Sequence, residues 1–134
     1  MTMALDNFTG LELWRQTVFE IVRQTDNDAD LSSRQMAILL NVYLTDPPHT
    51  VRALAADLNI SKPAVTRAID KLSVLGFIKR QTDEKDKRSV NLYRTIEGAC
   101  YVMRLGDIIA EKAGKITLPA PLRGENAPTP ENKA

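Results

Sequence analysis

The sequence predicts a mainly helical fold of the α+β class with one small β-hairpin. Apolar residues recur at helical spacings of three and four in five segments of the chain. Asn59 and Ile60 form a tight connection between two of these helices. Residues 77–82 and 89–94 alternate apolar and polar side chains on either side of a charged turn, which predicts the hairpin. The predicted order is therefore three helices, a tight turn, a fourth helix, the hairpin and a last helix.

The composition is typical of a globular protein of one domain. The chain has 134 residues, 43% of them apolar and 26% charged. A chain of this length buries about two-thirds of its unfolded surface and folds without disulfides or metal. The single cysteine, Cys100, excludes an internal disulfide, and the single histidine, His49, excludes a His-rich zinc site. Residues 1–6 show no signal peptide and no apolar run reaches ~20 residues, so we expect a cytoplasmic protein without a cofactor, metal or membrane partner.

Capping residues and helix breakers mark the first two helices. The first covers residues 10–25. In the second, Ser32 is the N-cap and Gln35, three residues later, completes a capping box. The prolines at 47 and 48 end this helix because neither can donate a helical N–H. The apolar stripe of the first helix comprises Leu11, Trp14, Val18 and Ile21 and is wider than one face. The predicted buried stripe of the second is Met36, Leu39, Leu40 and Tyr43 or Leu44.

The third and fourth helices are also capped. Thr50 begins the third helix, and Asn59 tolerates the left-handed conformation that the following turn requires. Ser61 caps the fourth helix, whose first turn accepts Pro63 without the loss of a hydrogen bond. Gly76 follows this helix as its C′ residue. The inward stripes are Val51, Leu54, Ala55 and Leu58 in the third helix, and Val65, Ala68, Ile69 and Leu72 in the fourth.

The last helix begins at Thr95 and is apolar on more than one face. Beyond it the composition changes, because four of the seven prolines lie between residues 119 and 130, among polar residues. This segment has too little apolar surface to bury itself. We therefore expect a folded domain of residues 1–118 and a disordered tail of residues 119–134.

Two helices joined by a tight turn and followed by a β-hairpin form a winged helix-turn-helix, whose second helix enters the major groove of DNA. The distribution of charge agrees with this function. Residues 50–94 contain ten basic and five acidic side chains, a net charge of +5, whereas residues 1–49 have a net charge of −4. The middle of the chain is thus the part suited to a polyanion, although charge alone more often marks a solvated face.

The helix of residues 61–75 is the predicted recognition helix. Its first turn is polar and has no acidic residue, so its free N–H groups can bind a phosphate together with Ser61. Arg67 can make a bidentate contact to guanine, and Thr66 can bond a base edge or meet a thymine methyl group. Lys71 lies one turn further along, where we expect it to contact phosphate. The predicted major-groove residues are Ser61, Lys62, Pro63, Thr66, Arg67 and Lys71.

The hairpin turn, residues 81–91, is the predicted wing. Asp83 and Asp86 would repel phosphate unless they bond the hairpin backbone or orient a neighbouring arginine. A solvated hairpin of mixed charge is the alternative interpretation. The wing residues predicted to reach a minor groove are Lys85, Lys87 and Arg88.

These motifs together resemble the MarR family of bacterial transcriptional regulators. The resemblance covers about residues 31–105 and rests on four segments: LAADLNISKPAVTRAIDKL from Leu54, GFIKR from Gly76, DEKDKRSVNL from Asp83 and TIEG from Thr95. It implies a homodimer that binds a pseudo-palindromic operator at the nucleoid, usually as a repressor, and is often released by a small-molecule effector or by oxidation. The DNA-reading part is then about residues 31–94. Lys85 stands where the family usually has arginine, and Arg88 can take over that role.

The first and last helices are the predicted dimer interface, as the resemblance also implies. A helix needs one apolar face to pack on its own domain, so surplus apolar residues indicate a partner. Because the chain reaches prolines soon after residue 115, we expect a smaller interface than is usual for the family. The predicted interface residues are Leu11, Trp14, Val18, Phe19, Tyr101, Leu105 and Ile108.

Other functions are less well supported. Cys100 lies on an apolar face of the last predicted helix, so we expect a small buried side chain rather than a nucleophile paired with His49 or a redox sensor. No phosphate-binding loop, metal cluster or catalytic triad is recognisable, and we do not expect an enzyme. A winged helix that binds only proteins would have an apolar or acidic recognition surface. An architectural DNA-binding protein without ligand control is a further alternative.

Overall fold

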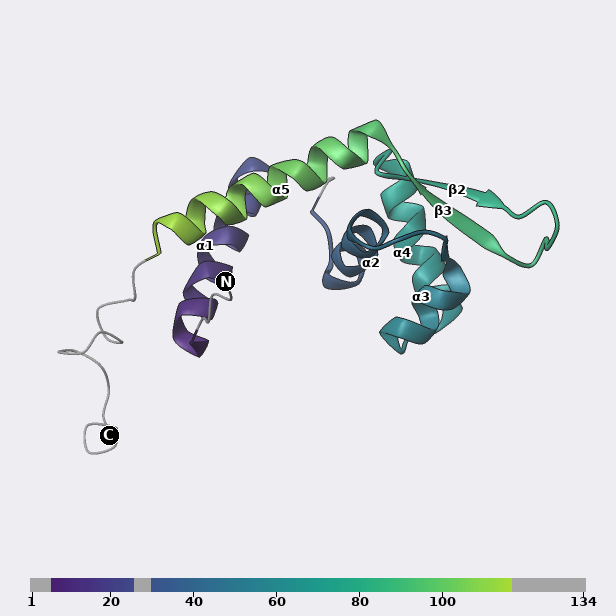
Figure 1. Cartoon of the computed structure of the whole chain (residues 1–134), viewed down its shortest axis with the longest axis horizontal. Helices are drawn as coiled ribbons and strands as arrows, with labels where there is room; N and C mark the ends of the chain where they lie inside the picture. The colour runs from purple at the N-terminus through teal and green to yellow at the C-terminus, as the bar shows by residue number, and fades with distance from the viewer. Residues whose placement is uncertain (1–5, 26–29, 117–134) are drawn as a thin grey trace, which may run out of the picture. The chain divides into compact units, whose positions relative to one another are not determined.

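The computed structural model describes residues 6–25 and 30–116 of the chain. The order of its elements matches the predicted one, with one additional strand (Figure 1). The chain forms two compact units. The first unit contains the N-terminal helix and the last helix from Leu105 onward, and the second contains the elements described between residues 30 and 104.

Five helices and three strands lie in the described ranges (Figure 1). The helices are α1 (Asn7–Gln24), α2 (Ser33–Leu44), α3 (Val51–Leu58), α4 (Lys62–Val74) and α5 (Ile96–Gly114). The strands are β1 (His49–Thr50), β2 (Ile78–Thr82) and β3 (Val90–Arg94).

The predicted helix caps of the second unit are confirmed. The Ser32 hydroxyl accepts a hydrogen bond from the Gln35 backbone, and the Gln35 side chain accepts one from the Ser32 backbone, which completes the capping box. Thr50 and Ser61 each accept a hydrogen bond from the backbone N–H three residues later. Asn59 has the left-handed conformation, with φ of 56°. These local signals determine where α3 ends and α4 begins.

The buried core of the second unit agrees with the prediction in α4 and differs from it in α2. The predicted α4 stripe of Val65, Ala68, Ile69 and Leu72 is buried. In α2 the buried residues are Ile38, Leu39 and Val42, whereas Leu44 is exposed. The helix is thus rotated by about one residue, roughly 100°, from the predicted orientation. Tyr43, one of the predicted inward residues, is partly buried, and its hydroxyl group has polar partners at the edge of the core.

Tyr43 connects α2 to both ends of the hairpin. Its hydroxyl group donates to the Phe77 carbonyl at 2.7 Å and accepts from the Thr95 backbone N–H at 2.9 Å. The Thr95 hydroxyl donates in turn to the Gly76 carbonyl and accepts from the Gly98 N–H. Residues before β2 and after β3 are therefore held to the same helix, which fixes the base of the hairpin and the first turn of α5.

The three strands form an antiparallel sheet in the order β1–β3–β2. β2 and β3 pair along their full length and form a ribbon that extends away from the helices of this unit (Figure 1). β1 has only two residues, His49 opposite Leu92 and Thr50 opposite Asn91. This strand was not predicted from the sequence, because two residues cannot show the alternation on which strand prediction depends.

In the first unit, α1 turns apolar residues outward. Leu11, Trp14, Phe19 and Val22 are between 59% and 64% exposed. The buried side chains are Thr17 and Glu12. The Arg15 guanidinium and the Gln16 amide donate to Glu12 and lower the pKa of its carboxyl group to about 2. Leu11 and Trp14 of the predicted apolar stripe are therefore exposed, whereas Val18 and Ile21 are partly buried.

The last helix buries one narrow stripe. Tyr101, Leu105 and Ile108 are 6–7% exposed, whereas Ile96 and Met103 are largely exposed. Within the first unit, Lys112 of α5 lies 3.8 Å from the Glu20 carboxylate of α1.

The predicted tail of residues 119–134 lies outside the described residues, and the domain boundary at residue 118 stays a prediction. In the described ranges, no helix combines the length and apolar character needed to cross a membrane. The same ranges contain no cluster of three or more His, Cys, Asp or Glu residues placed to hold a metal ion.

Candidate nucleic-acid interface

α4 presents the predicted major-groove residues on one free face. Ser61, Lys62, Pro63, Thr66 and Arg67 are exposed, and Lys71 is partly buried. The opposite face of the helix is buried in the core. α4 can therefore contact a second molecule with its polar face without disturbing its packing.

The start of α4 is suited to an anion. The Ser61 hydroxyl accepts from the Ala64 N–H at 3.2 Å, a proline occupies the first turn, and no acidic residue lies there. The remaining N–H groups of this turn have no partner within the helix, and the helix dipole adds partial positive charge. A phosphate oxygen is the kind of group that such a helix end binds.

Asp70 is the one acidic residue of α4 and lies on its exposed face. It forms an ion pair with Arg80 of β2, in which the Arg80 Nη1 donates to Oδ1 of the carboxylate. No role for either side chain was predicted from the sequence. The ion pair neutralises the acid at the surface that is expected to meet DNA.

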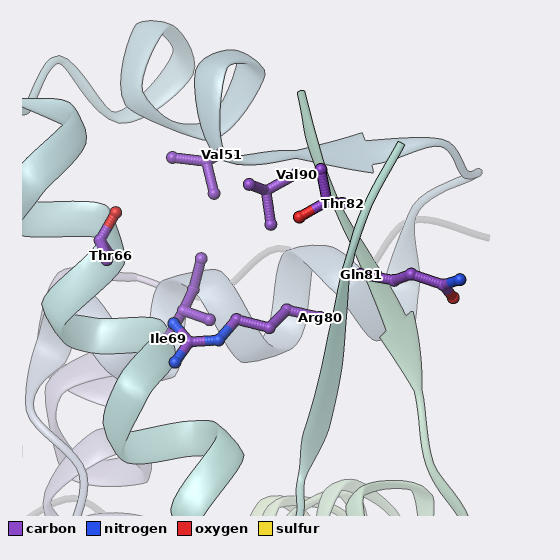
Figure 2. Close-up of a pocket in the computed structure, with 7 residues that line it drawn as sticks. All are labelled: Val51, Thr66, Ile69, Arg80, Gln81, Thr82 and Val90. Atoms are coloured by element: carbon purple, nitrogen blue, oxygen red, sulfur yellow. The ribbon is translucent and has the colours of Figure 1, made fainter. Parts of the chain in front are cut away.

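A pocket of about 300 Å³ lies between α4 and the hairpin. Figure 2 shows the Arg80 side chain extending from β2 across this pocket toward α4, while Gln81 points the other way. This alternation follows from the pleat of the strand, in which successive side chains lie on opposite faces. Residues lining the pocket are Val51, Thr66, Ile69, Arg80, Gln81, Thr82 and Val90.

The wing is ordered by its two aspartates, as expected from the sequence. The Asp83 carboxylate accepts from the N–H groups of Lys85 at 2.8 Å and Asp86 at 3.3 Å. These backbone hydrogen bonds hold the pKa of Asp83 below its ordinary value, and the one from Lys85 has the largest effect. Asp86 accepts from the Arg88 N–H at 3.1 Å and lies 3.6 Å from its guanidinium. The acids thus shape the turn, and the basic side chains of Lys85, Lys87 and Arg88 are exposed at its tip.

The predicted dimer residues of α1 are mostly exposed, whereas those of α5 are buried. Leu11, Trp14 and Phe19 are exposed on α1, and Val18 is partly buried beside them. Tyr101, Leu105 and Ile108 are already buried within one chain, and the Tyr101 ring stacks on Phe77 at 4.4 Å. An interface on α5 would therefore use other residues, since the exposed apolar side chains of this helix include Ile96 and Met103.

Cys100 is exposed, contrary to the expectation that it is buried. The buried stripe of α5 passes through Tyr101, the next residue along the helix. Consecutive helix residues differ by about 100° in direction, so Cys100 lies to one side of the stripe.

Comparisons with known sequences agree with the resemblance. A family model described as the MarR family matches residues 31–90. An uncharacterized HTH-type transcriptional regulator from Bacillus subtilis (strain 168), YkoM, is 35% identical over 72 residues. The match covers 54% of this chain and 47% of YkoM, so the chain spans about half the length of this curated relative.

Solved structures show the same fold. A MarR transcriptional regulator from Methanosarcina mazei Go1 is 30% identical with a TM-score of 0.59, and the match covers 77% of this chain and 72% of that one. The MepR–DNA complex of S. aureus is 23% identical with a TM-score of 0.61, and covers 77% of this chain and 86% of that one. The winged helix-turn-helix predicted from the sequence is therefore confirmed as the fold.

Proposed function

The chain belongs to the MarR family, and we propose that it is a transcriptional regulator that binds specific double-stranded DNA as a homodimer. The observation that best supports this function is the combination, within one unit, of the exposed N-terminal half of α4 and the basic tip of the wing. In a winged helix, α4 would enter the major groove and the wing would reach the minor groove. MepR, which shares the fold, is known in complex with DNA.

The homodimer follows from the geometry of recognition. One winged helix contacts only a few base pairs, whereas two copies related by a two-fold axis contact a pseudo-palindrome with half-sites about one helical turn apart. The exposed apolar face of α1 offers a self-complementary surface for such a dimer. We propose that the dimer acts at the nucleoid as a repressor, as the family resemblance implies.

Salt-dependent binding tests the function as a whole. Phosphate contacts release counterions, so the affinity of the purified protein for duplex DNA should fall steeply between low and physiological salt. A fluorescence anisotropy titration at several salt concentrations measures this dependence. A protein–protein adaptor would bind no duplex at any salt concentration, and that result would refute the proposal.

Replacing Arg67 with alanine should weaken binding to the specific site by about 1–3 kcal/mol and relax the preference at one base pair of each half-site. The reason is that Arg67 is exposed on the second turn of α4 and forms no ion pair within the described part of the chain. The measurement is binding to a set of duplexes that vary one base pair at a time. Arg34→Ala on α2, another exposed arginine, is the matched control. Equal losses on specific and random DNA would identify Arg67 as a phosphate contact.

Alanine substitutions at Lys85, Lys87 and Arg88 should weaken binding to all sequences nearly alike. Removing one phosphate contact should reduce the slope of log affinity against log salt by about 0.9. The reason is that these side chains are exposed at the tip of the wing, whose turn is held by hydrogen bonds that the substitutions leave in place. Lys115→Ala, one residue beyond α5, removes the same charge elsewhere and serves as the control. An unchanged slope in all three variants would refute the wing assignment.

A further inference from the structure

An acidic side chain at the centre of a DNA-facing surface needs an explanation. Asp70 is three residues after Arg67 and four after Thr66, so it lies on the same face of α4, one turn further along. A carboxylate at this place repels the phosphate backbone. It can also accept a hydrogen bond from a base, because the amino groups of cytosine and adenine point into the major groove.

Arg80 holds this carboxylate from a different element. β2 alternates, and Arg80 lies on the same face of the strand as the buried Ile78, the face turned toward α4. Its guanidinium bonds Oδ1 of Asp70, and Oδ2 has no hydrogen bond within the described residues. One oxygen of the carboxylate is thus used to fix its position, and the other is free to accept.

The ion pair has little importance for folding. The Arg80 and Asp70 side chains are 44% and 51% exposed, and ion pairs with this much solvent contribute little to stability. An arginine in β2 that lacked this partner would be free to bind phosphate, which every DNA sequence offers equally. The pair therefore removes one sequence-independent contact and leaves an oriented acceptor in its place.

We propose that Asp70, oriented by Arg80, is a specificity-determining residue of the interface described above, a role that rests on the proposed DNA-binding function. Its free oxygen accepts from the amino group of a cytosine or an adenine and repels the acceptor atoms of guanine and thymine edges. Arg80 is a positioning residue, because it acts through Asp70 and is kept away from the phosphate backbone by the same ion pair.

The decisive variant is Asp70→Asn, which frees the Arg80 cation and removes the negative acceptor. The probes are a duplex of about 30 base pairs that the wild-type protein selects from a random library, and a shuffled duplex of the same composition. We expect tighter binding to the shuffled duplex, a salt slope steeper by about 0.9, and a ratio of selected to shuffled affinity that falls on the order of tenfold. A second selection with this variant should change the preferred base at one position of each half-site.

Two further variants separate specificity from structure. Asp46→Asn removes an exposed carboxylate from the loop before β1 and should change neither the ratio nor the salt slope. Arg80→Gln removes the ion pair and leaves the Asp70 carboxylate charged and no longer neutralised by a partner. Its repulsion of the phosphate backbone should then lower the affinity for both duplexes, while the melting temperature of the protein stays close to that of the wild type. An Asp70→Asn variant with an unchanged affinity ratio and unchanged base preference would overturn the role of Asp70. The proposed DNA-binding function would still stand. A wild-type protein that binds no duplex would overturn the proposed function, and the inference with it.

Discussion

Replacing Gly98 with alanine should lower the free energy of unfolding by about 3 kcal/mol, at the upper end of the usual cost of overpacking. A Cβ atom on Gly98 would overlap the Tyr43 hydroxyl and the Phe77 carbonyl, and would lie 2.7 Å from Cζ of the Tyr43 ring. Neither neighbour can move freely, because the hydroxyl is bonded to the hairpin base and the carbonyl belongs to the backbone. Urea unfolding followed by circular dichroism measures the difference.

A second glycine of the same helix provides the control. A Cβ atom on Gly106 would meet nothing within 4 Å among residues 6–25 and 30–116. Gly106→Ala should therefore stabilise the protein by roughly 0.5–1 kcal/mol, the difference in helix propensity between the two residues. If both variants unfold at the same urea concentration, the close contact between α5, α2 and the hairpin base does not exist in solution.

Local sequence signals predicted the helix-turn-helix well. Caps depend on neighbouring residues, so Ser32, Thr50, Ser61 and Asn59 could be interpreted without knowledge of the fold. The aspartates of the wing are a similar case, since Asp83 and Asp86 bond backbone groups two or three residues away. Features of this kind position most of the predicted nucleic-acid surface, because they set the start of α4 and the shape of the wing.

Contacts between distant segments could not be predicted in the same way. The orientation of α2 depends on hydrogen bonds from Tyr43 to residues 34 and 52 positions away. β1 exists because two residues pair with β3, some forty positions later. The Asp70–Arg80 ion pair joins a helix to a strand, and neither residue alone indicates the other. Periodicity gives the shape of an apolar stripe but does not say which side of a helix the rest of the chain covers.

α1 is the clearest example of that limit and also the basis of the proposed dimer. Its sequence contains an apolar stripe wider than one face, and periodicity alone does not divide that stripe between the protein's own core and a partner. In the structure most of its large apolar side chains are exposed, and the buried side chains are Thr17 and Glu12. An exposed stripe of this size on a helix is typical of a surface that packs against a partner. The stripe comprises Phe8, Leu11, Trp14, Phe19 and Val22.

Phe19→Glu should convert the dimer into folded monomers that bind DNA poorly. Phe19 is 64% exposed in one chain, so a glutamate there disturbs the packing of the monomer little. In a two-fold dimer the change occurs twice, and each buried carboxylate costs roughly 3–5 kcal/mol. Leu105, another of the predicted interface residues, is 6% exposed, so an aspartate there would destabilise the fold of the monomer as well. Multi-angle light scattering at micromolar concentration measures the mass, with 14.9 kDa expected for the variant and twice that for the wild type.

Ser33→Glu is the matched control, because it adds one negative charge at an exposed helix position in the other unit. It should leave both the mass and the affinity for DNA unchanged. Far-ultraviolet circular dichroism of both variants should show the helix content of the wild type, which separates loss of the dimer from loss of the fold. A wild-type mass near 14.9 kDa together with full DNA binding would contradict the dimer. The outward apolar face of α1 would then have to be covered by a different partner, since an exposed stripe of large apolar side chains favours association.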